Sequence, residues 1–172
     1  MNEAIPKTAD LTARTVPKTQ FLIFALAGCE MGVDIGRVRE IIRYPEMTIM
    51  PKAPRFMEGI MNLRGRIFPV LDLKKRFEMP PVDRTAESRI VVLEVRGQVF
   101  GLLVDKVKEV LAVPAPEIFL EPRPFLTVGS AYILGFLQPA DRLVALLNMD
   151  EVFSFADIKA YSDQESANRL EG

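Results

Sequence analysis

The amino-acid sequence predicts an all-β protein in which two similar barrel-like subdomains pack together as one folding unit. Three observations lead to this prediction: many short apolar segments, an internal repeat, and a length of 172 residues. Ten glycines and thirteen prolines interrupt the chain, so long helices have little room before residue 140. Because units of about seventy residues bury too little surface alone, the two repeated halves are expected to share a core.

Ten short apolar segments are predicted to be strands, because β-branched and aromatic residues are frequent in them and turn residues separate them. Short strands at this spacing are typical of sandwiches and barrels. In chain order the segments are FLIFAL (21–26), MGVDI (31–35), VREIIR (38–43), GIMNL (59–63), RIFPVL (66–71), RIVVLEV (89–95), VFGLLV (99–104), VKEVL (107–111), YILGFL (132–137) and RLVALL (142–147). Pro69 has no N–H, so its strand is predicted to lie at a sheet edge or to bulge there.

The internal repeat covers most of the chain. Residues 21–42 align with residues 90–111 at a constant offset and without a gap. After a shift of seven residues, 59–77 aligns with 135–153. Glycines and apolar positions coincide, which indicates a duplicated structural unit. Each half is therefore predicted to contain about five strands and a short helix.

Glycines recur at equivalent positions of the two halves. Gly28 matches Gly97 and Gly32 matches Gly101, in each case where one predicted strand gives way to the next. Neither of the glycine-rich patterns that bind nucleotide phosphates, G-x-G-x-x-G and G-x-x-x-x-G-K-[ST], occurs in the sequence. Hairpin or bulge geometry is therefore predicted for these glycines rather than ligand contact.

Asp72 and Asn148 also coincide in the repeat and are predicted to cap short helices that follow a strand. The last helix is predicted to begin at Asn148, with apolar residues at helical spacing on one face. These residues are Met149, Val152, Phe153, Ala156 and Ala160. The expected domain spans residues 18–155, between a flexible tail at 1–17 and the helix end and acidic tail at 156–172.

Composition excludes several classes of chemistry. With no histidine, the chain has no imidazole base, no Ser-His or Cys-His nucleophile pair and no His metal ligand. A single cysteine, Cys29, can form neither an intramolecular disulfide nor a Cys-rich zinc site. The adjacent Asp150 and Glu151 are expected in a first helical turn rather than in acid–base catalysis. No catalytic residue, metal or cofactor is therefore predicted.

Charge and hydropathy restrict the partners. Lys and Arg number 22 and Asp and Glu number 23, so the strong positive field that nonspecific nucleic-acid binding needs is absent. The N-terminus lacks the apolar region of a secretory signal. The most apolar stretch, 21–29, is well short of the ~18 residues of a membrane helix. A soluble cytoplasmic protein is expected, with no nucleic-acid partner and no direct membrane insertion.

One turn differs between the halves. NLRG (62–65) separates two apolar strands of the first half, and its counterpart in the second half is QPAD (138–141). Because a duplicated fold repeats what its structure needs, an element present in one copy is the better candidate for function. Arg64 offers a five-donor fork suited to a carboxylate, and Glu40 is its predicted partner. Structural and recognition roles both stay open for this pair, since Glu109 recurs without an equivalent arginine.

At these residues the sequence resembles the CheW-like chemotaxis coupling proteins, over about residues 20–155. The matching motifs are FLIFAL, GVDIGRVREII, GLLVDKVKEVL and the string G-x-x-NLRG-x-x-x-PV-x-DL. The resemblance implies two intertwined five-stranded SH3-like β-barrel subdomains with short connecting helices and a C-terminal helix. It also implies a non-enzymatic adaptor that joins the cytoplasmic tips of methyl-accepting chemotaxis receptors to the regulatory domain of the histidine kinase CheA. Such adaptors act in receptor arrays on the inner face of the cytoplasmic membrane.

The resemblance further implies two sets of contact residues. Receptor contact is implied for seven residues that would line a groove between the subdomains: Val38, Glu40, Gly59, Asn62, Leu63, Arg64 and Gly65. Kinase contact is implied for Val107, Val110, Leu111 and Phe119, although an apolar strand residue more often belongs to a core. Two alternatives remain. One is an enzyme with a deep polar pocket, and the other is a scaffold of the same fold in a pilus-based or developmental chemosensory pathway.

Overall fold

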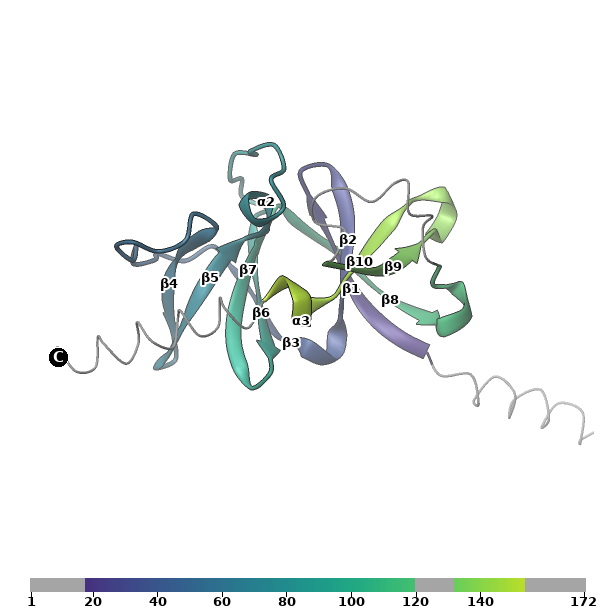
Figure 1. Cartoon of the computed structure of the whole chain (residues 1–172), viewed down its shortest axis with the longest axis horizontal. Coiled ribbons are helices and arrows are strands. Elements are labelled where there is room, and N and C mark those ends of the chain that lie inside the picture. The colour runs from purple at the N-terminus through teal and green to yellow at the C-terminus, as the bar shows by residue number, and fades with distance from the viewer. Residues whose placement is uncertain (1–17, 120–131, 154–172) are drawn as a thin grey trace, which may run out of the picture.

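The computed structural model describes residues 18–119 and 132–153, which are arranged as Figure 1 shows. The strands are β1 (Lys18–Leu26), β2 (Cys29–Asp34), β3 (Val38–Arg43), β4 (Met57–Leu63), β5 (Arg66–Asp72), β6 (Arg89–Val95), β7 (Gln98–Val104), β8 (Lys106–Pro114), β9 (Ile133–Leu137) and β10 (Val144–Leu147). The helices are α2 (Leu73–Arg76), α3 (Met149–Val152) and the 3₁₀ turns η1 (Ile35–Arg37), η2 (Ala115–Glu117) and η5 (Pro139–Asp141). Each predicted strand overlaps one of these strands. In this part of the chain no helix is both long and apolar enough to cross a membrane.

The strands form two five-stranded mixed sheets, in the orders β8-β1-β2-β10-β9 and β3-β6-β7-β5-β4, which lie side by side in Figure 1. The repeat maps β1–β5 onto β6–β10, and it therefore maps one sheet onto the other, strand for strand. Each sheet contains the first two strands of one half and the last three strands of the other half. The prediction of two intertwined five-stranded subdomains is confirmed.

The pairing register is repeated as well. The ladder between β1 and β8 shifts by one residue beside Glu109, where Lys108 is left without a partner position. The ladder between β3 and β6 shifts in the same way beside Glu40, at Arg39. These are equivalent positions of the repeat, so the duplication preserves a β-bulge and not only the strand order.

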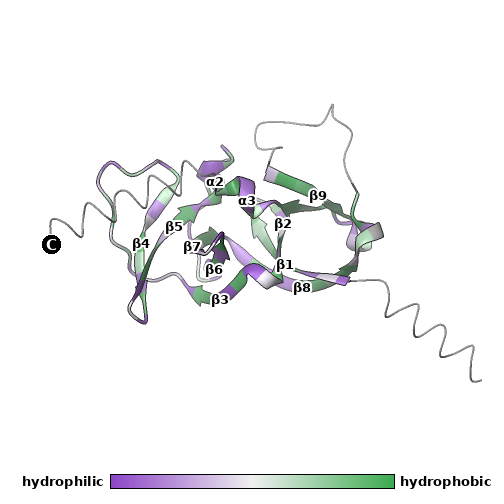
Figure 2. Ribbon diagram, turned by 60° about the horizontal axis from the view of Figure 1, so that its bottom comes forward, coloured by the Kyte–Doolittle hydropathy of each residue, from purple (hydrophilic) through white to green (hydrophobic). Residues whose placement is uncertain are grey.

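Each sheet curls until its two edge strands approach each other, as Figure 2 shows for the sheet that contains β1, β8 and β9. In that sheet Phe119, which follows β8, forms an isolated bridge with Phe136 of β9. In the other sheet Thr48, which follows β3, forms the equivalent bridge with Ile60 of β4. Each barrel is therefore closed by an isolated bridge rather than by a continuous ladder.

Among the described residues, three clusters of buried side chains make up the core. Along β1, Phe21 and Ile23 face the interior of their own sheet, whereas Leu22 and Phe24 enter the cluster between the two sheets. β6 alternates in the same way, so both strands are covered on both faces, which explains their continuous apolar sequences. The cluster between the sheets is the largest and includes residues of α2 and α3. The shared core predicted from the repeat is confirmed.

The repeated glycines serve two different purposes. Gly28 and Gly97 have φ of +81° and +77° in the two-residue loops of their hairpins, as predicted. Gly32 and Gly101 instead lie inside β2 and β7, so the prediction of a turn or bulge there is wrong. A Cβ atom on Gly101 would lie 2.8 Å from Ile90 Cγ2, and close packing is therefore what requires glycine at this position.

The prediction that Pro69 marks a sheet edge or a bulge is also wrong. β5 is an interior strand between β4 and β7, and the register shift in its ladder with β4 lies between Met57 and Gly59. The parallel ladder with β7 begins only at Val70, so Pro69 is paired on one side alone. A residue without an N–H is tolerated there because the two ladders of β5 are staggered.

The predicted helix caps are confirmed in part. The Asp72 side chain accepts a hydrogen bond of 2.9 Å from Lys74 N and so caps α2. Asn148 occupies the equivalent position before α3, but its side chain makes no capping hydrogen bond. Ala156, Ala160 and the predicted tails lie outside the described residues.

Candidate protein-interaction surface

The NLRG turn forms the tip of the β4–β5 hairpin. Leu63 pairs with Arg66, which leaves Arg64 and Gly65 as a two-residue loop with φ of 53° and 82°. Positive φ at both positions suits the twist of the flanking strands, as in type I′ hairpins. The Asn62 side-chain oxygen accepts a hydrogen bond of 2.9 Å from Gly65 N. The loop therefore holds Arg64 at the hairpin tip, where 75% of its side chain is exposed.

Arg64 donates two parallel hydrogen bonds to Glu40 on β3. The Nη1–Oε2 and Nη2–Oε1 distances are both 2.9 Å, so the predicted pair is confirmed. These hydrogen bonds, together with the negative charge of Glu40, raise the pKa of the Arg64 guanidinium above its ordinary value. Because β3 and β4 are opposite edge strands of one sheet, the pair joins those edges and holds the guanidinium in one orientation.

The other sheet contains a pair of the same kind. Arg142 Nη2 lies 2.7 Å from Glu109 Oε1, and Arg142 Nη1 lies 2.8 Å from Glu30 Oε1. The hydrogen bond to Glu109 is the main cause that raises the pKa of Arg142. Glu109 is the repeat equivalent of Glu40, so this glutamate has an arginine partner in both halves, although the two arginines do not occupy equivalent positions of the repeat. The alignment of the two halves does not identify this partner, because Arg142 aligns with Arg66 and not with Arg64.

The backbone of the turn recurs too. Ala140 and Asp141 align with Arg64 and Gly65, and their φ values of 49° and 63° lie in the same left-handed region. The backbone conformation of the turn is therefore present in both halves, and what is present in only one half is a side chain. It is the exposed guanidinium at the hairpin tip, and an alanine stands in its place in the second half.

The other residues implied in receptor contact have different surroundings. Val38 is half-buried and packs against the cluster between the sheets. Gly59 is buried, and a Cβ atom there would lie 2.9 Å from Met47 Cβ. Leu63 is half-buried against the core of its own sheet. In Figures 1 and 2 β4 is the strand farthest from the other sheet.

Strands β3 and β5 each carry an exposed apolar side chain. Ile41 on β3 is 41% exposed, and Ile67 on β5, opposite Asn62, is 57% exposed. Neither was identified from the sequence, because both lie in apolar segments and the covered face of a strand depends on its neighbours. Their repeat equivalents, Val110 and Leu143, are exposed as well. Each sheet therefore has one arginine–glutamate pair and two exposed apolar residues at equivalent positions of the repeat.

Among the residues implied in kinase contact, Val110 is the exposed one. Val107 is half-buried against the cluster between the sheets, and Leu111 packs against the core of its own sheet. Phe119 lines a cavity of about 290 Å³ at the end of β8, and its ring lies 6.0 Å from that of Phe136. The structure thus brings Val110 to the surface of β8 and places the other three residues largely in packing roles.

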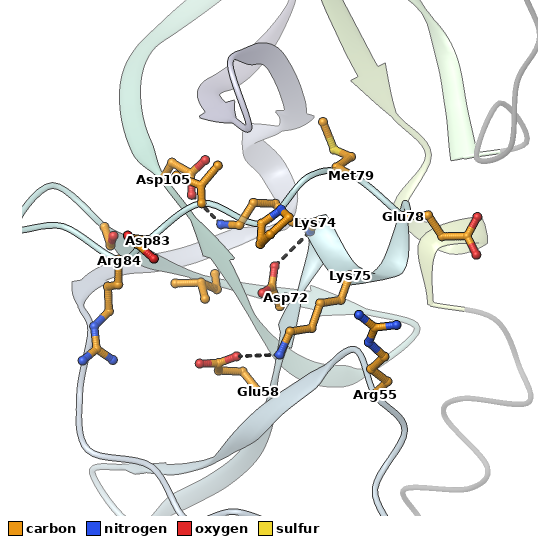
Figure 3. A pocket seen from close by; sticks show the side chains of 14 residues that line it. Arg55, Glu58, Asp72, Lys74, Lys75, Glu78, Met79, Asp83, Arg84 and Asp105 are labelled. Atoms are coloured by element: carbon orange, nitrogen blue, oxygen red, sulfur yellow. Dashed lines mark hydrogen bonds and ion pairs between the residues drawn. The ribbon is translucent and has the colours of Figure 1, made fainter.

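A larger cavity, of about 570 Å³, lies beside α2 and is shown in Figure 3. Its lining contains many charged side chains, and several of them form ion pairs with one another. Lys74 Nζ pairs with Asp105, and Lys75 Nζ lies 3.8 Å from Glu58. Asp72 caps α2. These contacts give the charged groups a structural role, and across residues 18–119 and 132–153 no cluster of His, Cys, Asp and Glu could hold a metal ion.

Glu58, which lines this cavity, also forms a hydrogen bond with the residue that follows β3. Tyr44 donates a hydrogen bond of 2.7 Å to Glu58, and the Arg84 guanidinium lies 3.8 Å from the centre of the Tyr44 ring. Burial, followed by the hydrogen bond and charge of Glu58, raises the pKa of the Tyr44 hydroxyl. The segment between the two halves, which contains Arg84, is therefore anchored to the first half.

Comparison with known proteins gives a consistent result. A family model described as the CheW-like domain matches residues 20–157. The chemotaxis protein CheW of Klebsiella aerogenes is 33% identical over 135 residues, which cover 78% of this chain and 81% of that protein. The probable chemotaxis protein CheW of Rhizobium etli is 34% identical over 143 residues, covering 82% and 91%. The crystal structure of the scaffolding protein TtCheW from Thermoanaerobacter tengcongensis superposes with a TM-score of 0.75 at 35% identity, covering 81% of this chain and 90% of that one.

Proposed function

The chain belongs to the CheW-like domain family, whose scaffolding proteins are not enzymes, and on this premise we propose that it couples chemoreceptors to a histidine kinase. As a chemotaxis scaffold of this family, it would join the cytoplasmic tips of methyl-accepting receptors to the regulatory domain of CheA. It would act in the cytoplasm, at receptor arrays on the inner face of the membrane, and would help to assemble them.

The exposed Arg64 guanidinium is the observation that carries the receptor part of this proposal. Its orientation is held by Glu40, and Ile41 and Ile67 are exposed apolar side chains of the same sheet. A helical hairpin with an apolar face can bury exposed apolar side chains of the sheet while its polar groups meet Arg64. The surface is small, so a single contact is expected to be weak.

The kinase contact is proposed for the other sheet, around Val110 on β8. Because β3 and β8 belong to different sheets, the two partners would have separate surfaces on one scaffold. Weak contacts that are repeated in an array raise the effective concentration of each partner for the next. A change in the receptor can alter the kinase only if the contacts of the scaffold differ between the receptor states.

The substitution Arg64→Glu tests the receptor contact. It places two carboxylates together at the rim and removes the exposed cation, so we expect at least a tenfold loss of receptor pull-down and of receptor-dependent kinase activity. The matched control is Arg66→Glu, which makes the same change of charge at an exposed neighbour in the same hairpin. Undiminished coupling by a well-folded Arg64→Glu protein would refute the proposal.

A charge exchange separates recognition from structure. The double variant Glu40→Arg with Arg64→Glu restores an ion pair across the edge strands but moves the guanidinium from the hairpin tip to β3. If the pair serves recognition, receptor pull-down stays low in this variant. If it serves only to join the edges, pull-down returns to the level of the unsubstituted chain.

A second candidate is the same scaffold in a chemosensory pathway whose output is not flagellar, such as pilus-based or developmental control. Protein FrzA of Myxococcus xanthus, a relative that is not named as CheW, is 26% identical over 152 residues, which cover 87% of this chain and 95% of that protein. Deletion of the gene followed by separate assays of swimming and of surface movement distinguishes the two pathways. Loss of swimming alone supports the flagellar proposal, and loss of surface movement alone supports the second.

A further inference from the structure

Helix α2 makes two charged contacts in different directions, which Figure 3 shows as dashed lines. Lys74 Nζ lies 2.5 Å from Asp105 Oδ1, and Lys75 Nζ lies 3.8 Å from Glu58 Oε2. Neighbouring residues of a helix project about 100° apart, so one turn of α2 serves both contacts. Asp105 precedes β8, the strand proposed for kinase contact, and Glu58 lies on β4, which leads into the hairpin tip proposed for receptor contact. The helix therefore stands between the two proposed surfaces.

The contact with Asp105 is tight and fixes α2 to the start of β8. Only 5% of the Lys74 side chain is exposed. The second carboxylate oxygen of Asp105 accepts a hydrogen bond of 2.7 Å from Ala27 N in the β1–β2 turn, and Asp105 N donates one of 3.1 Å to Ala25 O. A displacement of α2 would therefore be passed to the first residues of β8, the strand on which Val110 is exposed.

The contact with Glu58 is looser. Its distance of 3.8 Å is close to the limit of an ion pair, and 43% of the Lys75 side chain is exposed. Glu58 also accepts the hydrogen bond of 2.7 Å from the Tyr44 hydroxyl, so it has two donors and can strengthen or release the one on α2 without becoming unpaired. Both residues of this contact line the larger cavity, where no packed side chain restricts such a change. The contact with Glu58 is therefore the adjustable one.

The second half lacks an equivalent series of charged contacts. Gly36 aligns with Asp105 and has no side chain. Glu151 of α3 aligns with Lys75, but across residues 18–119 and 132–153 it has no ion-pair partner, and Asp150 supplies the ion pairs of α3. The series from an edge strand through a helix to the other sheet is therefore present in one half of the described chain, as is the exposed guanidinium of the NLRG turn.

We propose that α2 couples the two surfaces, so that receptor binding at the β4–β5 hairpin changes the affinity of β8 for the kinase. A receptor that displaces β4 alters the contact between Glu58 and Lys75, and the contact between Lys74 and Asp105 passes the displacement of α2 to β8. The two lysines are positioning residues in this device, because neither lies on a proposed surface. The inference rests on the proposed function and adds a route by which one partner affects the other. Such coupling is a free energy shared by both sites, and it is reciprocal.

The coupling is measured with the full-length chain, a soluble receptor fragment that contains the cytoplasmic tip, and CheA, both from the organism that encodes the chain. Isothermal titration calorimetry gives the apparent dissociation constant for CheA with and without a saturating amount of the receptor fragment. The ratio of the two constants is the coupling factor, which we expect to differ from one by at least fivefold in the unsubstituted chain. The reverse titration, with CheA saturating and the receptor fragment added, has to give the same factor.

The substitution Lys75→Glu tests the adjustable contact, because it places a second carboxylate beside Glu58. We expect the coupling factor to move at least fivefold toward one, while the affinity for each partner alone changes less than twofold. The double variant Glu58→Lys with Lys75→Glu makes an ion pair of opposite sign at the same place, and it is expected to restore the factor to within twofold. A role in stability alone would alter neither the factor nor its restoration. The matched control is Glu151→Lys, a charge reversal at the equivalent position of α3, which is expected to leave the factor unchanged.

Each outcome decides the inference. A coupling factor of one in the unsubstituted chain, an unchanged factor in Lys75→Glu, or no restoration by a folded double variant overturns it. The proposed function survives these outcomes, since the chain still binds both partners. If the double variant does not fold, Lys75→Met decides, because it removes the contact without adding a charge, and an unchanged factor in that variant overturns the inference. Failure of the unsubstituted chain to bind the receptor fragment or CheA refutes the proposed function and this inference with it.

Discussion

At some positions inside the strands, the side chains packed nearby decide which residue type fits. A Cβ atom on Gly101 would lie 2.8 Å from Ile90 Cγ2 and 3.0 Å from Val70 Cγ2. Ile90 and Val70 are both branched at Cβ, so their side chains have few alternative rotamers. At the equivalent Gly32 the nearest atom is Cδ1 of Ile23, at 2.9 Å, which is a terminal methyl that can rotate away. The two glycines occupy the same repeat position but differ in how far their neighbours can adjust.

Alanine substitutions at these two glycines are expected to differ in cost. Gly101→Ala should lower the free energy of unfolding by about 1–3 kcal/mol, the range for overpacking a core. Gly32→Ala should cost clearly less, because the Ile23 methyl can move. Urea unfolding followed by far-UV circular dichroism measures both, since the chain has no tryptophan. Equal losses in the two variants would contradict the explanation from stiff neighbours.

At the scale of elements, the two short helices are held in different ways. The Asp72 carboxylate accepts from the backbone of α2 and is itself buried. Asn148 stands in the same place before α3 without a capping hydrogen bond, and α3 is instead held by the buried Met149 and Val152. The repeat conserves the position of each helix, whereas the interactions that stabilise it have diverged.

Removal of the two N-cap side chains is expected to show this divergence. Asp72→Ala should lower the free energy of unfolding by about 1 kcal/mol, within the ~0.5–2 kcal/mol usual for a lost cap. Asn148→Ala should change it by less than ~0.5 kcal/mol, because no capping bond is lost. Chemical denaturation of the two variants beside the unsubstituted chain gives both values. A larger loss at Asn148 than at Asp72 would contradict the assignment of the caps.

At the scale of the whole molecule, the two barrels share their largest core. β1 and β6 each supply alternate side chains to that core and to the interior of one barrel. The exchange of strands between the halves also means that neither barrel can form from one half of the chain. Partial unfolding would therefore expose apolar surface in both barrels, and a cooperative transition is the physical consequence.

Core substitutions in different clusters should therefore affect one common transition. Phe153→Ala acts on the core between the sheets and Phe68→Ala on the interior of one barrel, and each should cost about 3–5 kcal/mol. In both variants, differential scanning calorimetry is expected to show a single transition with equal calorimetric and van't Hoff enthalpies. Two resolved transitions in the Phe68→Ala protein would show that the barrels unfold separately.

The part of the candidate surface that could be predicted from the sequence is the pair of Arg64 and Glu40 at the NLRG turn. Glu40 and Arg64 could be paired from the sequence because a carboxylate and a fork-shaped donor complement each other. The pair of Glu109 and Arg142 could not be predicted, because Arg142 aligns with Arg66 and not with Arg64. Its contact with Glu109 depends on how the edges of the sheet approach each other. The exposure of Ile67 could not be predicted from the sequence either, because it depends on whether a neighbouring element covers that face of β5.

By itself, the sequence determined the ten strands, the turns at Gly28 and Gly97, and the equivalence of the two halves. These features follow from local preferences and from comparison of the chain with itself. Only the tertiary structure decided which strands cross between the halves, that Gly32 and Gly101 are set by packing, and that Asp150 of α3 pairs with Arg37. Each of these depends on atoms brought together from distant parts of the chain, which no local pattern records.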